Sequence, residues 1–487
     1  MLSDEPTGRL LVASNRLPIS LRRDPIGEWQ ATPSAGGLVT ALNPVLQRRG
    51  GVWIGWHGAT AEEGGDELRD LGGLIDMGYA LAPISLSDRQ RDHFYLGFAN
   101  EAIWPLFHDL PTRCTFNPDY WTAYREVNRA FALAIRDELR PDDTVWVHDY
   151  HLMHVAADLA ALGAEAPTAF FLHIPFPPPD IFLKLPWREQ VLEALLDYGR
   201  LGFQTARDLR NFVESARVLL PRGAVRGRGR TATVRHQGRT VSLGAYPIGV
   251  DAAAFSAAAD APAVQELAQQ LREAHAPGRM VLGVDRLDYT KGIVERLAAF
   301  RYLLASEPDL REQITLVQVV VPSRTDIAEY AGLKAEIEQL VGEINGEFTR
   351  PGWVPVHYLF RALAHEELLA YYRAADIALI TPLKDGMNLV AKEFSVCNRA
   401  DGALILSEFA GAAEQLRVGA LLVNPYDIAG TAGAIHRAAA LPRAERRARL
   451  RALRRVVSRQ DVYAWVDQFL AGAEPGPAEA ALLAAQV

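Results

Sequence analysis

Thr381-Pro-Leu-Lys-Asp-Gly-Met-Asn-Leu-Val-Ala-Lys-Glu393 is the most informative stretch of this sequence, both for its structure and for its chemistry. The apolar run before it, Asp376 to Ile380, predicts a buried strand, and a helix is expected to follow the turn. Gly386 lets the chain turn tightly, so that backbone N–H groups at the helix start point outward and favour phosphate oxygens. Glu393, two turns into the helix, is placed to accept hydrogen bonds from a ribose diol. Taken alone, the stretch fits equally an ordinary strand–turn–helix junction with a solvated glutamate.

A second stretch carries two cations at the end of another predicted strand. Arg286 and Lys291 lie five residues apart, directly after the apolar run Met280 to Val284. An arginine offers a planar fork of donors and a lysine a compact charge, so the pair can clamp one diphosphate. Such a clamp would stabilise the charge that develops on a leaving diphosphate. Surface ion pairs with Asp285 and Asp288 are the alternative interpretation.

Together with seven other motifs in the same order, these stretches resemble the trehalose-6-phosphate synthases. These are retaining glycosyltransferases that join glucose from a sugar nucleotide to glucose 6-phosphate. The resemblance runs from about Leu10 to about Asp467. The matching motifs are Ser14-Asn-Arg-Leu-Pro18, Ser34-Ala-Gly-Gly-Leu38, Trp104-Pro-Leu-Phe-His108, Val147-His-Asp-Tyr-His-Leu152, Phe171-Leu-His-Ile-Pro-Phe-Pro177, Tyr246-Pro-Ile-Gly249, Val284 to Gly292, Pro322-Ser-Arg-Thr-Asp326 and Asp385 to Glu393.

The pattern of the whole chain predicts an α/β protein. Its 487 residues exceed what one hydrophobic core usually supports, so two domains of about 230 residues each are expected. Short β-branched or aromatic runs alternate with Ala/Leu-rich segments of helical period, which is typical of parallel sheets covered by helices. The predicted strands are Leu10–Ala13, Val52–Ile54, Thr144–Val147, Ala169–His173, Leu201–Gln204, Met280–Val284, Thr315–Val321, Val354–Leu359, Ile377–Thr381, Ala403–Leu406 and Leu421–Val423.

The resemblance implies the GT-B fold, in which two Rossmann-like lobes face a central cleft. Residues 1–248 would form an acceptor-binding N-terminal lobe, and residues 249–462 a nucleotide-sugar-binding C-terminal lobe. The Pro/Gly turn at Tyr246 to Asp251 suggests the boundary. Residues 463–487 would form a C-terminal helix and tail that cross back to the N-terminal lobe.

The resemblance also implies donor-binding residues. A missing Cβ at Gly36 and Gly37 would let backbone amides approach the donor diphosphate. Leu363 stands where a relative has Phe, so any contact of Leu363 with the donor would be made by its backbone. The full donor set is Gly36, Gly37, Arg286, Lys291, Leu363, Asp385, Gly386, Met387, Asn388, Leu389, Val390 and Glu393.

For the acceptor, the resemblance implies a phosphate clamp of two arginines and a phenol, an apolar wall and a carboxylate facing the sugar. These are Arg16, Arg324 and Tyr95 for the clamp, Trp104 for the wall and Asp149 for the carboxylate. The implied catalytic residues are His173, Arg286, Lys291 and Asp385. Neither His173 nor Asp385 is expected to be a nucleophile, because the departing phosphate oxygen is thought to take the acceptor's proton on the same face. The protein would align the substrates and stabilise the leaving group.

The implied reaction is UDP-glucose plus glucose 6-phosphate giving α,α-trehalose 6-phosphate plus UDP. A glucosylglycerol-phosphate synthase, which takes glycerol 3-phosphate, is the first alternative, because its donor motifs are closely similar. A non-catalytic sensor of sugar phosphates is the second, although the intact Arg286, Lys291, Asp385 and Glu393 argue against it. The donor base stays open, because Glu393 addresses a ribose that UDP, GDP and ADP share.

Composition argues against other classes of function. A net charge of −8 disfavours general nucleic-acid or membrane binding. The two cysteines give no disulfide framework, and the N-terminus lacks a signal peptide, so a cytoplasmic location is expected. Small-molecule substrates are the expected partners, with a homo-oligomer as an open option. The resemblance requires no cofactor and no metal.

Two further features of the sequence suggest alternative functions, namely metal binding and nucleic-acid binding. His148, His151 and His154 have a spacing that could bring metal ligands to one helix face, but His148 precedes the predicted helix. Arginines crowd residues 222–239 and recur from Arg443 to Arg455. Without interleaved aromatics, a solvated hairpin and a charged helix face are favoured there over nucleic-acid binding.

Overall fold

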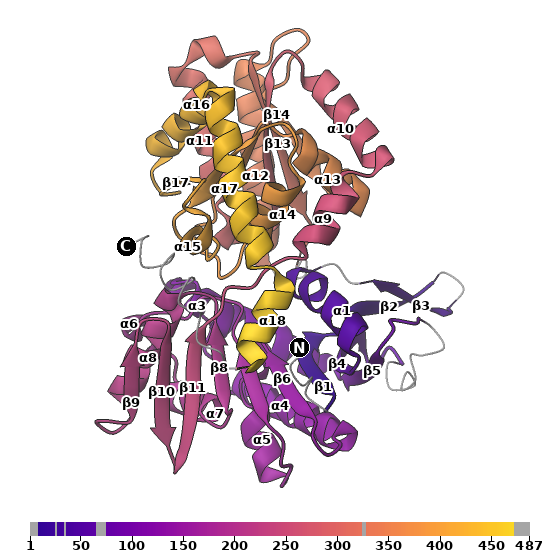
Figure 1. Cartoon of the computed structure of the whole chain (residues 1–487), viewed down its shortest axis with the longest axis vertical. Coiled ribbons are helices and arrows are strands. Elements are labelled where there is room, and N and C mark those ends of the chain that lie inside the picture. Colours follow the sequence, from indigo (N-terminus) through magenta and orange to yellow (C-terminus); the bar gives the residue numbers. More distant parts are fainter. Residues whose placement is uncertain (1–7, 25–26, 34–35, 65–74, 324–327, 472–487) are drawn as a thin grey trace, which may run out of the picture. The chain divides into compact units, whose positions relative to one another are not determined.

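The computed structural model describes residues 8–24, 27–33, 36–64, 75–323 and 328–471. The chain forms two compact units (Figure 1). Unit 1 comprises the chain up to Pro247 together with the chain from Trp465 onward, and unit 2 comprises Ile248–Ala464. Within the described residues, no helix combines the length and apolar character that crossing a membrane requires.

Unit 1 is built on a nine-stranded sheet in the order β5-β4-β1-β6-β7-β8-β11-β10-β9. In this order, each strand from β5 through β8 is parallel to the next one, and β8 is parallel to β11. β10 is antiparallel to both β11 and β9. The strands are β1 Leu10–Arg16, β4 Val52–Thr60, β5 Ala80–Leu86, β6 Thr144–His148, β7 Thr168–Phe171, β8 Arg200–Phe203, β9 Val225–Arg228, β10 Thr231–His236 and β11 Arg239–Ala245, with a separate hairpin of β2 Ile19–Arg23 and β3 Trp29–Pro33. The five strands predicted for this part of the chain are confirmed.

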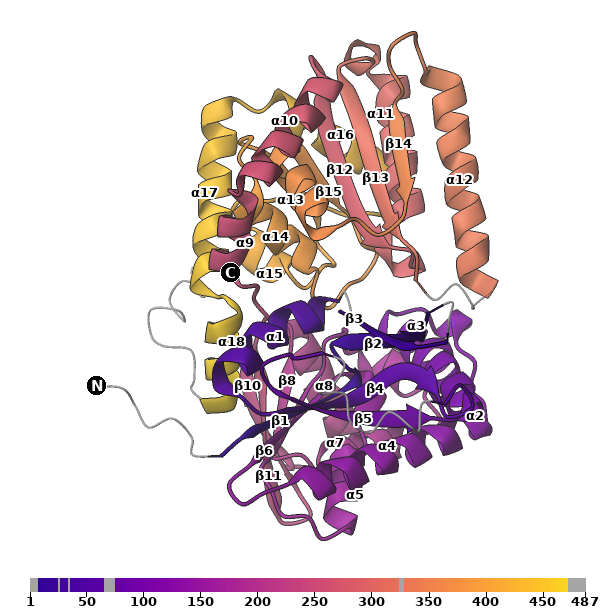
Figure 2. The ribbon, with the colours of Figure 1, turned by 90° about the vertical axis from the view of Figure 1, so that its right-hand side faces the viewer.

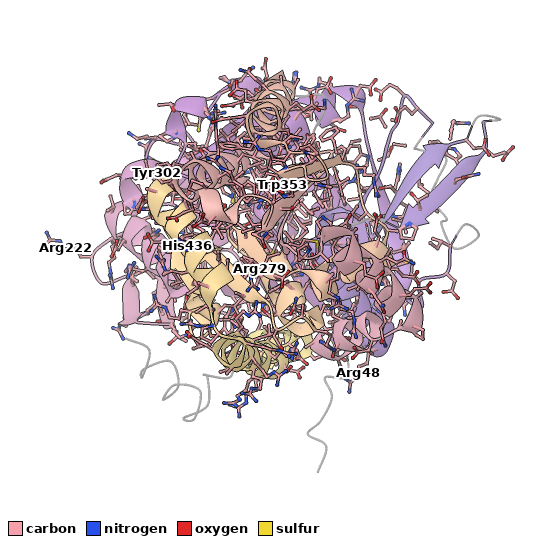
Figure 3. All side chains as sticks on the ribbon, turned by 90° about the horizontal axis from the view of Figure 1, so that it is seen from above. Arg48, Arg222, Arg279, Tyr302, Trp353 and His436 are labelled. Carbon is pink, nitrogen blue, oxygen red and sulfur yellow. The ribbon has the colours of Figure 1, made fainter. Side chains whose placement is uncertain are left out.

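The strands that were not predicted are β5, the antiparallel strands β9 to β11 and the separate hairpin of β2 and β3. β5 is an edge strand that contains Pro83, and a proline weakens the sequence signal of a strand. The arginine-rich segment forms the antiparallel strands β9 to β11, which confirms the hairpin prediction. Arg222, Arg226, Arg235 and Arg239 are exposed, and Arg222 points outward in Figure 3.

The helices of unit 1 include an unusual π-helix, η2 (Arg91–Ile103). π-Helical turns are rare and occur mostly at functional sites. The regular helices are α1 Gly37–Arg49, α2 Asp88–Gln90, α3 Trp104–Phe107, α4 Pro118–Glu138, α5 Val155–Ala161, α6 Pro179–Phe182, α7 Arg188–Leu195 and α8 Ala206–Leu219. α4 packs against β4 and β5, and α8 against β8 and β11.

Unit 2 is built on a six-stranded parallel sheet in the order β14-β13-β12-β15-β16-β17. Its strands β14, β13, β12 and β15 are labelled in Figure 2. Its strands are β12 Arg279–Arg286, β13 Ile314–Val321, β14 Val356–Phe360, β15 Ile377–Ile380, β16 Ala403–Ser407 and β17 Leu421–Val423, so all six predicted strands are confirmed. Its helices are α9 Ala252–Ala259, α10 Pro262–His275, α11 Ile293–Ser306, α12 Ala328–Phe348, α13 His365–Ala374, α14 Leu389–Cys397, α15 Ala413–Leu416, α16 Ile428–Ala440 and α17 Arg443–Arg459.

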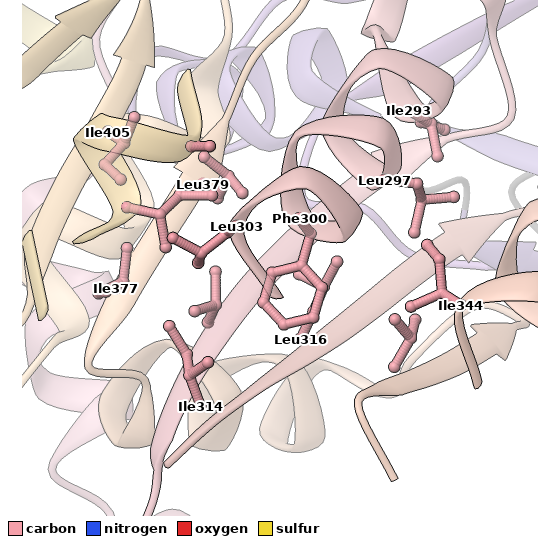
Figure 4. Close-up of a cluster of buried hydrophobic side chains, with 14 of the residues drawn as sticks. Ile293, Leu297, Phe300, Leu303, Ile314, Leu316, Ile344, Ile377, Leu379 and Ile405 are labelled. Atoms are coloured by element: carbon pink, nitrogen blue, oxygen red, sulfur yellow. The ribbon is translucent and has the colours of Figure 1, made fainter. Parts of the chain in front are cut away.

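The strands of unit 2 are near-continuous apolar runs because both faces of the sheet are covered. On one face, Phe300 and Leu303 of α11 pack with Ile314 and Leu316 of β13, and all four side chains are buried (Figure 4). On α17 the arginines form the predicted charged face, whereas Leu450, Leu453 and Val457 are buried.

The final helix, α18 (Val462–Ala471), begins in unit 2 and ends in unit 1. Trp465 lies with its ring centroid 4.9 Å from that of Trp146 and 5.0 Å from that of Phe171. The guanidinium of Arg200 donates to the carbonyl of Leu470 at 2.8 Å. The last turns of the described chain are therefore part of the core of unit 1.

Candidate active site

Except for Gly36 and Gly37, which lie in unit 1, the residues predicted to hold a nucleotide diphosphate lie in unit 2, and most of them follow the carboxyl ends of its strands, where open α/β sheets bind ligands. Arg286 is the last residue of β12 and is exposed. Lys291 follows in a short 3₁₀ turn, Tyr289–Lys291. Asp385 lies in the loop that follows the neighbouring strand β15.

Lys291 and Asp385 form an ion pair. The Nζ–Oδ2 distance is 2.6 Å, and each side chain is only 11% exposed. The same carboxylate accepts from the backbone N–H of Met387 at 3.1 Å and from the side-chain amide of Asn388 at 3.3 Å. Asp385 therefore both places the lysine and shapes the turn before α14.

The sequence prediction attributed the tight turn before α14 to Gly386. In the structure, two other residues are required for this turn. Asn388 is the residue with left-handed backbone, at φ 62°, and its side chain accepts from the N–H of Ala391 at 3.3 Å. A second glycine, Gly411, is required by packing, since a Cβ there would lie 1.8 Å from the carbonyl oxygen of Gly386. Helix geometry leaves the first N–H groups of α14, at Leu389 and Val390, without intrahelical acceptors, as an anion site needs.

Glu393 lies on α14, half-buried, and accepts a hydrogen bond from the phenol of Tyr372 at 2.9 Å. Burial raises the pKa of Glu393 to about 7, although the bond from Tyr372 opposes that rise. The carboxyl group therefore changes its charge near neutral pH in the unliganded protein. Leu363 lies half-buried in the loop between β14 and α13.

The sequence analysis missed Arg296, whose guanidinium is fully buried beneath these residues. Its Nε donates to the hydroxyl of Thr381 at 3.0 Å, and its Nη2 donates to the carbonyl of Lys291 at 3.3 Å. Its Nη1 bonds to the carboxylate of Asp285 and, at 3.0 Å, to Oε1 of Gln318. One side chain thus ties together the ends of β12, β13 and β15 and the lysine turn.

Two sequence signals point to this arrangement. Arg296 lies on the buried face of α11, between Ile293 and Leu297, where an apolar residue is expected. Gly283 lies within β12, where a Cβ would come within 2.7 Å of Nη1 of Arg296. A glycine in a strand often marks such a close approach.

The predicted acceptor residues gather in unit 1, starting at the end of β1. Arg16 pairs in register with Trp56 of β4, and its guanidinium lies 4.4 Å from the centre of the Trp56 ring. Gly58, at φ 106°, makes room for it, since a Cβ would lie 2.7 Å from Nη2 of Arg16. Tyr95, on the π-helix η2, contacts Trp56 edge-on, with ring centroids 6.0 Å apart.

The row of rings continues through two residues that follow β6. Tyr95 stacks on His151, with ring centroids 6.0 Å apart, and His151 contacts Tyr150 at 3.9 Å. The ring of Trp104 lies 5.8 Å from that of Tyr150, and Trp104 is only 5% exposed. Arg16, Tyr95 and Trp104 are therefore joined by aromatic contacts. Arg324, the remaining predicted acceptor residue, lies outside the described residues.

Asp149 has a backbone conformation that is nearly restricted to glycine, with φ 74° and ψ 166°. Such a conformation costs about 1–3 kcal/mol and is found mostly at functional sites. The surroundings hold it in place, because its N–H donates to the carbonyl of Phe171 at 2.8 Å and its carboxylate accepts from the N–H of His173 at 3.2 Å. The strain supports a functional role for this carboxylate.

His173 is buried, and both of its ring nitrogens are bonded within the protein. They lie 3.0 Å from Nδ1 of His148 and 3.1 Å from Nε2 of Gln204. Burial lowers the pKa of His173 to about 3, so the ring is neutral at physiological pH. A neutral imidazole held in this way is suited to fixing the chain after β7 and the position of Asp149.

The histidines considered as metal ligands face separate partners. His148 contacts His173, His151 lies between Tyr95 and Tyr150, and Nδ1 of His154 lies 2.7 Å from the guanidinium of Arg125. Across the residues that the structure describes, no group of three candidate ligands lies together for a metal ion.

Gly36 and Gly37 lie at the start of α1 in unit 1, with Gly36 just before the first turn of the helix. The backbone of Gly36 is extended, at φ 173°, and a Cβ there would meet no atom of the described residues within 4 Å. The role of both glycines at a donor diphosphate stays a prediction.

Comparisons with known proteins match this chain over nearly its whole length. The model of glycosyltransferase family 20 matches residues 8–474. The trehalose-6-phosphate synthase of Mycobacterium bovis is 42% identical over 476 residues, which cover 96% of this chain and 95% of that protein.

Solved structures are similar over the same extent. An α,α-trehalose-phosphate synthase (UDP-forming) from Burkholderia xenovorans, in complex with glucose-6-phosphate, is 36% identical, with a TM-score of 0.86 over 96% of this chain and 99% of that chain. A structure from E. coli bound with UDP-2-fluoro glucose is 35% identical, with a TM-score of 0.86 over 96% of this chain and 98% of that one. The predicted α/β fold of two Rossmann-like lobes, GT-B, is confirmed. With a family model and close relatives that span nearly its whole length, the chain belongs to glycosyltransferase family 20.

Proposed function

We propose that this chain is a trehalose-6-phosphate synthase, which transfers glucose from UDP-glucose to glucose 6-phosphate with retention of configuration. The products are α,α-trehalose 6-phosphate and UDP. The relatives' names and the ligands of the two solved structures support this reaction. Within the chain, the observation that carries it is the cationic strand end of Arg286 and Lys291 beside the first turn of α14.

On the donor side, each residue has a physical role in the proposal. Arg286 and Lys291 stabilise the negative charge on the departing UDP, and the N–H groups of Leu389 and Val390 bind its phosphate oxygens. Glu393 accepts from the ribose diol. Asp385, which is held by Lys291 at 2.6 Å, orients the hydroxyls of the transferred glucose. Gly36 and Gly37 contribute backbone amides, and Leu363 a backbone contact.

On the acceptor side, Arg16, Tyr95 and Arg324 bind the phosphate of glucose 6-phosphate, because charged donors make short, strong bonds to a phosphomonoester. Trp104 packs beside the sugar, and Asp149 accepts from a sugar hydroxyl. The strained backbone of Asp149 supports a functional role for its carboxylate, which in this proposal is to accept from a hydroxyl of the acceptor.

The bond changes in this proposal need no covalent intermediate. The C1–O bond to the diphosphate breaks, and the oxygen of the acceptor hydroxyl forms a new bond to C1 on the same face. The departing phosphate oxygen takes the hydroxyl proton. His173, which is neutral, holds the strand end that positions Asp149.

We further propose that the reaction needs no cofactor and takes place in the cytoplasm. The leaving diphosphate already meets two cationic side chains, Arg286 and Lys291, and the sugar nucleotide is itself a substrate. Both cysteines, Cys114 and Cys397, are free thiols, as a reducing compartment favours.

The experiment that tests the proposal is a grid of UDP-, GDP- and ADP-glucose against glucose 6-phosphate and glycerol 3-phosphate. Nucleotide release is measured, and the phosphorylated product is identified by NMR. The proposal expects a non-reducing α,α-1,1 disaccharide phosphate from UDP-glucose and glucose 6-phosphate. Turnover with glycerol 3-phosphate alone would make the chain a glucosylglycerol-phosphate synthase, and binding without turnover would make it a sensor.

Arg286→Ala is expected to lower kcat by about 10²–10³-fold, because it removes a preorganised cation that faces the leaving diphosphate. The exposed Arg455, on α17, is the matched control, and Arg455→Ala should leave kcat unchanged. Steady-state kinetics with both substrates saturating make the comparison. An Arg286→Ala enzyme with the wild-type kcat would remove this residue from the site.

UDP-glucose affinity is expected to rise with pH up to about 7 and then level off. The ionised Glu393 accepts two hydroxyl donors, and its pKa of about 7 means that it must lose a proton on binding. Linkage then makes the Kd at pH 6 about tenfold higher than at pH 8. UDP-glucose is the suitable probe because its diphosphate diester does not titrate in this range.

Calorimetry between pH 6 and pH 8 would measure this dependence. Glu393→Gln should bind more weakly and without the pH dependence, whereas Glu366→Gln, at an exposed position of α13, should behave like the wild type. A pH dependence that persists in Glu393→Gln would assign it to another group.

A further inference from the structure

Lys392, the residue before Glu393 on α14, is 3% exposed. Its ammonium group donates to the backbone carbonyl of Ile248 and to Oε1 of Gln415. The side chains of Glu393 and Lys392 therefore extend from the same helix turn but contact different residues. The first carries the proposed ribose contact, and the second is bonded to the interior of unit 2.

The hydrogen bonds of Lys392 determine which atoms donate and which accept in a longer chain of hydrogen bonds. An ammonium group can only donate, so Gln415 must turn its oxygen towards Lys392. The amide nitrogen of Gln415 then donates to Oε1 of Gln460, which directly follows α17. Gln415 is itself 4% exposed. Lys392 thus reaches two segments distant in sequence, at Ile248 and at Gln460.

These two segments are where the chain enters and leaves unit 2. Ile248 is the first residue of the unit, and Ala464 is its last. The segments are also paired, because the N–H of Val462 donates to the carbonyl of Val250 at 3.2 Å. Gly249 allows this close approach, since a Cβ there would lie 2.2 Å from the carbonyl carbon of Asp461.

Stability alone does not account for a lysine at this position. Among the described residues, no carboxylate forms an ion pair with Lys392, in contrast to Lys291 with Asp385. A buried, unpaired charge is costly, and burial lowers the pKa of Lys392 to about 7. An apolar side chain of similar length would fill the space at lower cost. The hydrogen bonds made by the amine are what such a replacement would lose.

We propose that Lys392 is a positioning residue for the transfer reaction, whose hydrogen bonds fasten the donor-binding turn of α14 to the two segments through which the chain enters and leaves unit 2. The inference rests on the proposed donor site and adds to it a residue that touches neither substrate. Lys392 holds Glu393 and the first turn of α14 in register with the paired segments at Gly249 and Asp461.

Lys392→Met tests the proposal, because methionine keeps an unbranched side chain but donates no hydrogen bond. The expected result is a loss of at least tenfold in kcat/KM for UDP-glucose, with less than a twofold change in KM for glucose 6-phosphate. Ser395→Ala is the matched control. Ser395 is buried on the same helix, and its hydroxyl bonds only to the carbonyl of Ala391, at 2.6 Å, so its loss should leave both constants unchanged.

Gln415→Met tests the same chain of bonds from its other end and serves if Lys392→Met does not fold. In the double variant, the losses in kcat/KM should be clearly less than multiplicative, since either change already breaks the connection to Gln460. A purely structural role would change the thermal midpoint of unfolding without this selective effect on the donor.

The outcomes separate this inference from the proposed function. A wild-type protein that transfers glucose, with both variants within twofold of it in kcat/KM for UDP-glucose, would overturn the role of Lys392 and leave the function standing. A wild-type protein without transfer would refute the function. The role of Lys392 would then be judged by the Kd for UDP-glucose, measured by calorimetry, and an unchanged Kd in both variants would overturn it.

Discussion

A fully buried guanidinium, that of Arg296, holds together the strand ends and loops of unit 2 that carry the proposed donor site. Parallel strands bring their carboxyl ends to one edge, but they do not by themselves fix the loops that follow. Arg296 does so by bonding to Asp285 of β12, Gln318 of β13 and Thr381 after β15, and to the carbonyl of Lys291. The buried charge is compensated by the carboxylate and the polar bonds, as such a group requires. The positions of Arg286, Lys291 and Asp385 depend on this arrangement.

In unit 1 the comparable constraint is the strained backbone at Asp149, at φ 74°. The N–H of His173 holds the carboxylate, and His148 and Gln204 hold the ring of His173. Because burial keeps His173 neutral, this group positions a carboxylate without adding a charge of its own. In the proposed reaction the two units have different roles. Unit 2 would supply cations and helix amides for a diphosphate, and unit 1 a carboxylate and a row of aromatic rings beside Arg16.

Much of the fold and of the candidate site could be predicted from the sequence, because the strands of parallel sheets are apolar runs and the motifs stand at their ends. The eleven strands of the two parallel cores belong to this part, whereas the ion pair of Lys291 with Asp385 was not predicted. Edge strands such as β5, with Pro83, carry no comparable signal. The π-helix that bears Tyr95 depends on tertiary packing, which overrides local pattern. Arg296 and Lys392 were missed because a buried charge is recognisable only when its partners, which are distant in sequence, are known.

The activity of Arg296→Lys tests most directly whether the buried guanidinium positions the proposed phosphate clamp. A lysine can still reach Asp285, but it cannot bond to Thr381, Gln318 and the carbonyl of Lys291 at once. We expect unit 2 to remain folded while kcat/KM for UDP-glucose falls by about 100-fold or more, as for a displaced phosphate clamp. Adding Arg286→Ala should then cost far less than it does in the wild type. A folded Arg296→Lys enzyme within threefold of the wild type would show that Arg296 does not position the clamp.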